Sequence, residues 1–211
     1  MMRHTLSGFL LAIAIALAPA NARATSLAPL SEAQLTDAAT YIVQGTVTSV
    51  WSEVDDRGYI WTRAAVDVSR VYKGPDDPDF LVVEAMGGEI GERRMSVPSS
   101  ARFSEGERTL MFLAEIDHGR KLTPVGMFLG KYTVRRAPGE VRDHVIRYNR
   151  TTEQFDHRFL PHPPLEQRVY LDDLLEQVES RLDTGWDGKP IPGISPLKLE
   201  EINTPTRRLR R

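Results

Sequence analysis

Two long stretches of alternating apolar and polar residues constrain the fold of this chain more than any other feature. They cover residues 41–51 and 59–72, and Asp55 to Gly58 between them have the chemistry of a tight turn. Alternation with a period of two is typical of strands with one buried face. We therefore expect a long antiparallel hairpin. Its core face is expected to carry Val43, Val47, Val66 and Val68.

The other face of the second stretch is a candidate binding surface. Tyr59, Trp61 and Arg63 alternate there and are expected to point outward. Trp51 is a fourth candidate binding residue, although its spacing places it on the same face as Val47. OB folds often bind ligands on a strand face by stacking against aromatic rings. The alternative is that a C-terminal helix covers these rings.

The residues that follow predict further strands, with no helix long enough for parallel crossovers. Apolar runs between turn signals occur at 80–86, 93–97, 108–114, 121–128 and 130–134. Gly45 interrupts the first long strand and predicts a bulge, a bend or a close approach of backbone. Five or six strands within about 95 residues are typical of an antiparallel barrel or sandwich. We therefore expect a mainly β fold, namely a small antiparallel five- to six-stranded OB-like β-barrel.

Two amphipathic segments predict helices, one before and one after the strands in the sequence. Residues 30–39 begin with the capping-box pair Ser31 and Gln34, and residues 170–182 carry an apolar stripe at helical spacing. The expected organisation is a signal peptide at 1–24, the barrel domain at 25–138, a proline-punctuated connector with the amphipathic helix at 139–184, and a flexible basic tail at 185–211.

The N-terminal residues have the pattern of a secretory signal. Arg3 and His4 precede a short apolar run, and small residues offer cleavage after Ala22 or Ala24. No later apolar run is long enough to cross a bilayer. We therefore expect a periplasmic or secreted protein without a transmembrane segment after signal removal.

Composition excludes several classes of site. The chain has no cysteine, which excludes disulfides, thiolate metal sites and cysteine nucleophiles. Its formal net charge of -2 gives no argument for nucleic acid or an anionic membrane as a partner. We expect no cofactor.

Catalytic and metal motifs are weak. His157 and His162, with Asp156 beside them, are the best metal candidates, but their spacing fits no helical ligand pair. The glycine-rich residues 87–91 match neither a dinucleotide fingerprint nor a P-loop. No serine has the context of an activated nucleophile. We therefore expect a protein that is not an enzyme.

Several short segments together resemble a known family. They are residues 42–47, 59–62, 71–74, 87–88, 103–112 and 126–132. Over about residues 35–136 the pattern resembles uncharacterised exported bacterial proteins whose domain is similar to the OB-like barrel of TIMP and netrin modules. These motifs are turn glycines and core positions, so the resemblance implies a fold and no active site. TIMP-type inhibition uses an N-terminal cysteine, which this chain lacks.

Three functions follow from these observations. The first is an exported, non-enzymatic binding module that recognises a protein or polysaccharide through one barrel face. The second is a protease-associated inhibitor or accessory factor, with an exported protease as partner, which rests on fold analogy alone. The third is a hydrolase of unknown substrate that would use His157 or His162.

Overall fold

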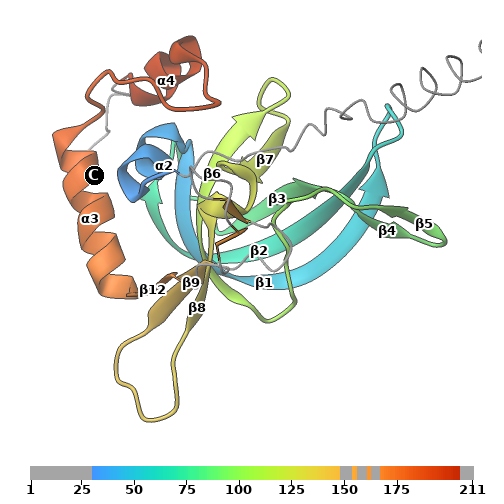
Figure 1. Cartoon of the computed structure of the whole chain (residues 1–211), viewed down its shortest axis with the longest axis horizontal. Helices are drawn as coiled ribbons and strands as arrows, with labels where there is room; N and C mark the ends of the chain where they lie inside the picture. The colour runs from blue at the N-terminus through green and yellow to red at the C-terminus, as the bar shows by residue number, and fades with distance from the viewer. Residues whose placement is uncertain (1–29, 148–153, 156–160, 163–166, 205–211) are drawn as a thin grey trace, which may run out of the picture.

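The computed structural model describes residues 30–147, 154–155, 161–162 and 167–204 (Figure 1). The fold is mainly β, as expected. The strands are β1 (Tyr41–Val54), β2 (Ile60–Lys73), β3 (Phe80–Met86), β4 (Gly88–Ile90), β5 (Arg93–Met95), β6 (Arg108–Ile116), β7 (Lys121–Pro124), β8 (Lys131–Arg135), β9 (His144–Arg147), β10 (Gln154–Phe155), β11 (Pro161–His162) and β12 (Gln167–Tyr170). The helices are α2 (Glu32–Ala38), α3 (Leu171–Thr184), α4 (Pro196–Asn203) and the 3-10 turn η1 (Met127–Gly130).

The predicted long hairpin is confirmed. β1 and β2 pair antiparallel from Ile42 opposite Lys73 to Val54 opposite Ile60. The pairing shifts register at three places, one of them between Gln44 and Gly45. A Cβ on Gly45 would lie 2.4 Å from the carbonyl oxygen of Asp67. The glycine therefore marks both a bulge and a close approach of backbone, because no side chain fits between the two strands there.

The expectation of a purely antiparallel sheet of five or six strands is wrong. The main sheet has eight strands in the order β1-β2-β3-β7-β6-β8-β9-β12, and β1 also pairs with β6. One pair is parallel, with Val83 of β3 opposite Leu122 of β7. β7 reaches β3 only after the long connection that contains β4, β5 and β6, so it can run in the same direction. β9 and β12 come from the polar residues after 138, where strands of four residues leave little alternation to recognise.

Apolar side chains are buried on both faces of the sheet. One cluster contains Val43, Val47, Val66 and Leu113, so these three valines lie in the core as predicted, while Val68 is only partly buried beside them. A second cluster lies under the helices and includes Ile42. This cluster also contains Leu35, Leu110, Phe112, Tyr132, Leu174, Val178 and Leu199.

The helices cover the side of the sheet that bears the second cluster. The capping box of α2 is present, since the backbone N–H of Gln34 donates to the Ser31 hydroxyl and the Gln34 side chain accepts from the Ser31 backbone. α3 buries Leu174 and Val178 against this cluster. The expectation of a single C-terminal helix is wrong, because α4 follows α3 and buries Leu199 completely.

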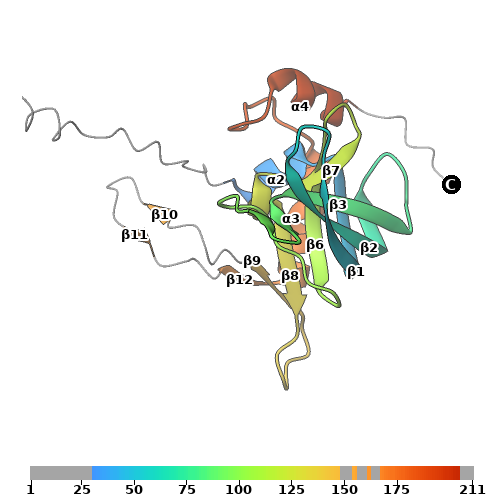
Figure 2. The same cartoon turned by 90° about the vertical axis from the view of Figure 1, so that its right-hand side faces the viewer.

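Two views show where these helices lie relative to the hairpins. In Figure 1, α3 and the β4–β5 hairpin lie on opposite sides of the sheet. Figure 2 shows the β8–β9 hairpin projecting away from α4. Within the described residues, no helix has the length and apolar composition needed to span a bilayer.

Candidate functional site

The register of the first hairpin brings three of the four candidate binding residues to one face of the sheet. The fourth, Tyr59, lies two residues before Trp61, just before β2 begins. Trp51 lies opposite Arg63 and Glu53 lies opposite Trp61, so Trp51, Trp61 and Arg63 share a face. This corrects the placement of Trp51 on the face of Val47. The register shift between Val47 and Ser49 inserts an extra residue, and one extra residue moves every later side chain to the other face.

Trp61 is not exposed on this face. Its relative exposure is 8%, whereas that of Tyr59 is 48%. The indole N–H donates to Oδ2 of Asp55 at 2.9 Å, and the ammonium group of Lys121 lies 3.7 Å from the ring centroid. The expectation of an outward-pointing ring is therefore wrong for Trp61. Lys121 of β7 covers the Trp61 ring, whereas the C-terminal helices pack on the second apolar cluster.

Charged side chains connect the two tryptophans across four strands. Arg63 pairs with Glu53 on β1 and, through Nε at 3.1 Å, with Oε1 of Glu84 on β3. Lys121 lies 3.6 Å from the other oxygen of Glu84 and 3.9 Å from Oδ2 of Asp55. Trp51 donates its indole N–H to Glu53 at 2.7 Å.

These eight residues form one surface, which we call the aromatic–ionic face. It consists of Trp51, Glu53, Asp55, Tyr59, Trp61, Arg63, Glu84 and Lys121. Its three carboxylates and two cations are mutually paired, so these charged side chains are held in place before any ligand arrives.

The rim of this face is formed by two turns. Burial raises the pKa of Asp55, but hydrogen bonds from Trp61 and from two backbone N–H groups, together with the charge of Lys121, lower it to below its ordinary value. The pKa of Asp117, in the β6–β7 turn, is lowered first by a hydrogen bond from Arg120 and then by the charges of Arg57 and Lys121. Both turns therefore carry ionised carboxylates at neutral pH.

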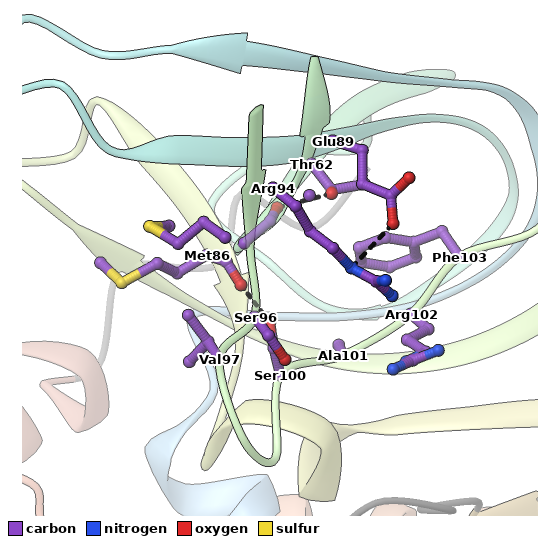
Figure 3. A pocket seen from close by; sticks show the side chains of 13 residues that line it. Thr62, Met86, Glu89, Arg94, Ser96, Val97, Ser100, Ala101, Arg102 and Phe103 are labelled. Carbon is purple, nitrogen blue, oxygen red and sulfur yellow. Dashed lines mark hydrogen bonds and ion pairs between the residues drawn. The ribbon is translucent and has the colours of Figure 1, made fainter. Parts of the chain in front are cut away.

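A pocket of about 240 Å³ lies at the same end of the hairpin, on the opposite face of β2. Thr62 of β2 lines it, with the β4–β5 hairpin on one side and residues 96–103 on the other (Figure 3). The Thr62 hydroxyl donates to the Gly87 carbonyl at 2.7 Å, and the Ser100 hydroxyl donates to the Met86 carbonyl at 2.6 Å. Both hydroxyl protons are therefore engaged in holding the pocket walls.

A larger groove of about 890 Å³ lies between the end of β2 and the helices α2, α3 and α4. Lys73 forms part of it and donates to the carbonyls of Thr36 at 2.9 Å and Asp37 at 3.3 Å. These carbonyls end helix α2, so Lys73 caps that helix. Burial lowers the pKa of Lys73 to about 8, against a smaller opposing effect of the Asp37 charge.

The metal candidates do not form a visible site. His157 lies outside the described residues, and for His162 only its place in β11 is described. Among the residues that are described, no group of three or more histidine or acidic side chains is placed to hold a metal ion. Ser99, Ser100 and Ser104 lie in the loop before β6, and no histidine lines the pocket that contains Ser100 within the described chain.

Comparison with known families and with curated protein sequences found no match. The contacts of the site are therefore the basis for its interpretation.

Sequence reasoning missed half of the aromatic–ionic face. Glu84 and Lys121 lie in strands that become neighbours only through the parallel β3–β7 pairing, which no local sequence pattern predicts. Glu53 could have been found, because the hairpin register alone places it opposite Trp61. Asp55 was interpreted only as a turn residue, although its carboxylate also accepts the Trp61 hydrogen bond.

Proposed function

We propose that this chain is an exported, non-enzymatic binding module that recognises a protein through its aromatic–ionic face. The observation that carries the proposal is the fixed arrangement of Trp51, Arg63 and Glu53 on a hairpin that also presents the exposed ring of Tyr59. Tryptophan, tyrosine and arginine are the side chains that contribute most binding energy at protein interfaces. Pairing within the face reduces the conformational entropy that binding must overcome.

The contacts favour a protein over a polysaccharide. Lys121 occupies the face of Trp61, so this ring is closed to stacking against a sugar. What remains accessible is Tyr59, the partly buried Trp51, the half-exposed carboxylate of Glu53 and the guanidinium of Arg63, whose side-chain exposures are 48% for Glu53 and 30% for Arg63. Such a mixture of signs suits a partner with complementary charges, which gives specificity and fast association.

We further propose that five of the strands form an OB-like barrel. The support is the cyclic order of pairing, in which β1 pairs with β2, β2 with β3, β3 with β7, β7 with β6, and β6 with β1. In an OB fold the face of the second and third strands binds ligands between two loops. Here Trp61, Arg63 and Glu84 occupy those strands, and the turns before β2 and β7 flank them.

Export is the second part of the proposal and has its own test. The apolar segment before Ala22 motivates it. Expression of the full chain followed by cell fractionation and N-terminal sequencing should give a mature protein that begins at Arg23 or Thr25. An intact N-terminus on a cytosolic protein would refute export.

Binding is tested by affinity capture with the mature protein immobilised. Envelope proteins and cell-wall glycans are offered to the wild type and to the variants Tyr59→Ala and Glu53→Lys. We avoid Trp61→Ala, because removing a buried ring would also destabilise the fold. Val141→Ala is the matched control, since Val141 is 88% exposed and lies outside the face.

The expected result is a protein that both face variants lose and the control retains. Equal capture by all four proteins would contradict the proposal, and loss of glycan binding alone would favour the polysaccharide alternative.

A further inference from the structure

We infer that the pocket in Figure 3 receives an acidic side chain of an extended peptide, held by the guanidinium groups of Arg102 and Arg94. The inference rests on the proposed function in one respect, which is that the partner is a protein. It adds that the pocket is a second contact with this protein partner and that it selects an acidic side chain.

The pocket has an apolar side and a cationic side. Figure 3 shows Met86 and Val97 together on one side, and Arg94, Arg102 and Phe103 on the other. Met95 also lines the pocket. Methionine side chains adapt their shape to different apolar groups, which suits recognition of a flexible peptide. The volume of about 240 Å³ is small for an independent ligand site, so it fits a part of a longer ligand.

The balance of charge at the pocket favours an anion. Arg102 is exposed and makes no ion pair or hydrogen bond with another described residue. Arg94 pairs with Glu89 at 2.9 Å, but both side chains are more than 60% exposed, and such pairs exchange readily with other partners. Among the residues that line the pocket, the two arginines at 94 and 102 stand against the single carboxylate of Glu89. A carboxylate fits this site, because guanidinium groups bind carboxylates through paired hydrogen bonds.

The strand arrangement points to a peptide as the source of the carboxylate. Within the described chain, β5 pairs only with β4, so the other edge of β5 keeps unpaired backbone groups. An extended peptide can add to such an edge through its own backbone, while alternate side chains enter neighbouring pockets. A free fatty acid offers the same carboxylate and an apolar chain, but it has no backbone groups to pair with β5.

The inference is tested by direct titration of the full mature protein. The probes are a fluorescein-labelled pentapeptide Leu-Glu-Leu-Glu-Leu, its counterpart Leu-Lys-Leu-Lys-Leu, and octanoate. Binding is followed by fluorescence anisotropy, with unlabelled octanoate as competitor, and by the methyl resonances of Met86 and Met95. We expect the acidic peptide to bind at least about tenfold more tightly than the basic one and to shift both methyl resonances.

Variants separate the pocket from general charge effects. Arg102→Ala should weaken the acidic peptide about fivefold or more, while Arg102→Lys should weaken it less, because lysine keeps the charge but not the paired donors. The control is Arg135→Ala, since Arg135 is an exposed arginine of β8 that does not line the pocket. It should leave the affinity unchanged.

Three results would overturn the inference. They are equal affinity for both peptides, unchanged affinity in Arg102→Ala, and methyl shifts with octanoate alone. Tyr59→Ala should leave this titration unchanged, because Tyr59 does not line the pocket. Failure of the aromatic–ionic face as a binding site would therefore be seen in the capture experiment and not here.

Discussion

The ammonium group of Lys121 lies 3.7 Å from the centre of the Trp61 ring. The two residues come from β7 and β2, which do not pair with each other, and β3 runs between them. Glu84 of β3 lies 3.6 Å from the same ammonium group. The contact therefore links β2 to β7 across β3, at the place where β3 and β7 share a single residue pair, Val83 with Leu122.

This contact should be measurable as a coupling energy. In a double-mutant cycle of Lys121→Met and Trp61→Leu, we expect the two changes to be coupled by about 1–2 kcal/mol in the free energy of unfolding. The reason is that the Lys121 side chain is only 14% exposed, so its charge is poorly screened by water. A matched cycle uses Arg142 and Tyr170, which stack at 3.9 Å on the surface and should couple less. Additive effects at Trp61 and Lys121 would show that the contact contributes nothing.

Gly45 should tolerate no side chain. Gly45→Ala should lower the free energy of unfolding by about 1–3 kcal/mol, because the new methyl group would meet the Asp67 carbonyl and a methyl group of Val66. Urea denaturation measures the change. Gly58→Asn is the control, since Gly58 has open space around it and asparagine tolerates a positive φ. If both variants were equally stable, the close approach of β1 and β2 would be in doubt.

Lys73 should make stability rise with pH in the alkaline range. Its pKa of about 8 in the folded protein lies below the ordinary value of 10.5, so the unfolded chain binds more protons between these two pH values. Stability therefore increases as pH rises through this window. The expected gain is on the order of 1–2 kcal/mol.

The measurement is urea denaturation at several pH values for the wild type and Lys73→Met. The series should stop below pH 10, which is the ordinary pKa of tyrosine. Burial and Asp76 raise the pKa of Tyr41, so above pH 10 this residue makes stability fall as pH rises. The variant should lose the rise with pH, although it should also be less stable, since the end of α2 loses its donor. An identical rise in both proteins would assign the effect to another group.

The pair between Arg181 and Asp37 should hold α3 against α2. Arg181 donates through Nε at 2.9 Å and through a terminal nitrogen at 2.7 Å to the two oxygens of Asp37, whose side chain is 6% exposed. Arg181→Met should cost about 2–4 kcal/mol, because a nearly buried carboxylate loses its partner.

Two variants control for this prediction. Arg181→Lys should recover part of the loss, since lysine restores the charge without the paired geometry. Lys189→Met breaks an exposed pair with Asp187 and should change stability by less than about 0.5 kcal/mol. Hydrogen exchange of α3 amides would locate the effect, and protection unchanged in Arg181→Met would refute the assignment.

Local signals in the sequence were sufficient for most strands and for two helices. The alternation in 41–51 and 59–72 predicted β1 and β2, and the capping box predicted α2, because each pattern is complete within a few residues. Helix α4 was missed, since its eight residues lie among glycines and prolines. Its burial of Leu199 depends on contact with α2, which no local pattern reports.

The candidate site was predictable only where it depended on one hairpin. Tyr59 and Arg63 followed from alternation, whereas the bulge after Val47 moved Trp51 to their face and was not visible from its residue types. The cover of Trp61 by Lys121 depends on pairing between strands far apart in the sequence. Burial of a large ring therefore could not be inferred from its position in β2.

The most direct test of binding through the aromatic–ionic face is site-specific photo-crosslinking in the cell envelope. A photoreactive phenylalanine analogue replaces Tyr59 in one protein and Val141, the most exposed large apolar residue among those that the structure describes, in another. We predict a discrete adduct with one protein from position 59, its loss when Glu53→Lys is added, and none from position 141. No adduct from position 59, or the same adducts from both positions, would contradict the proposed function.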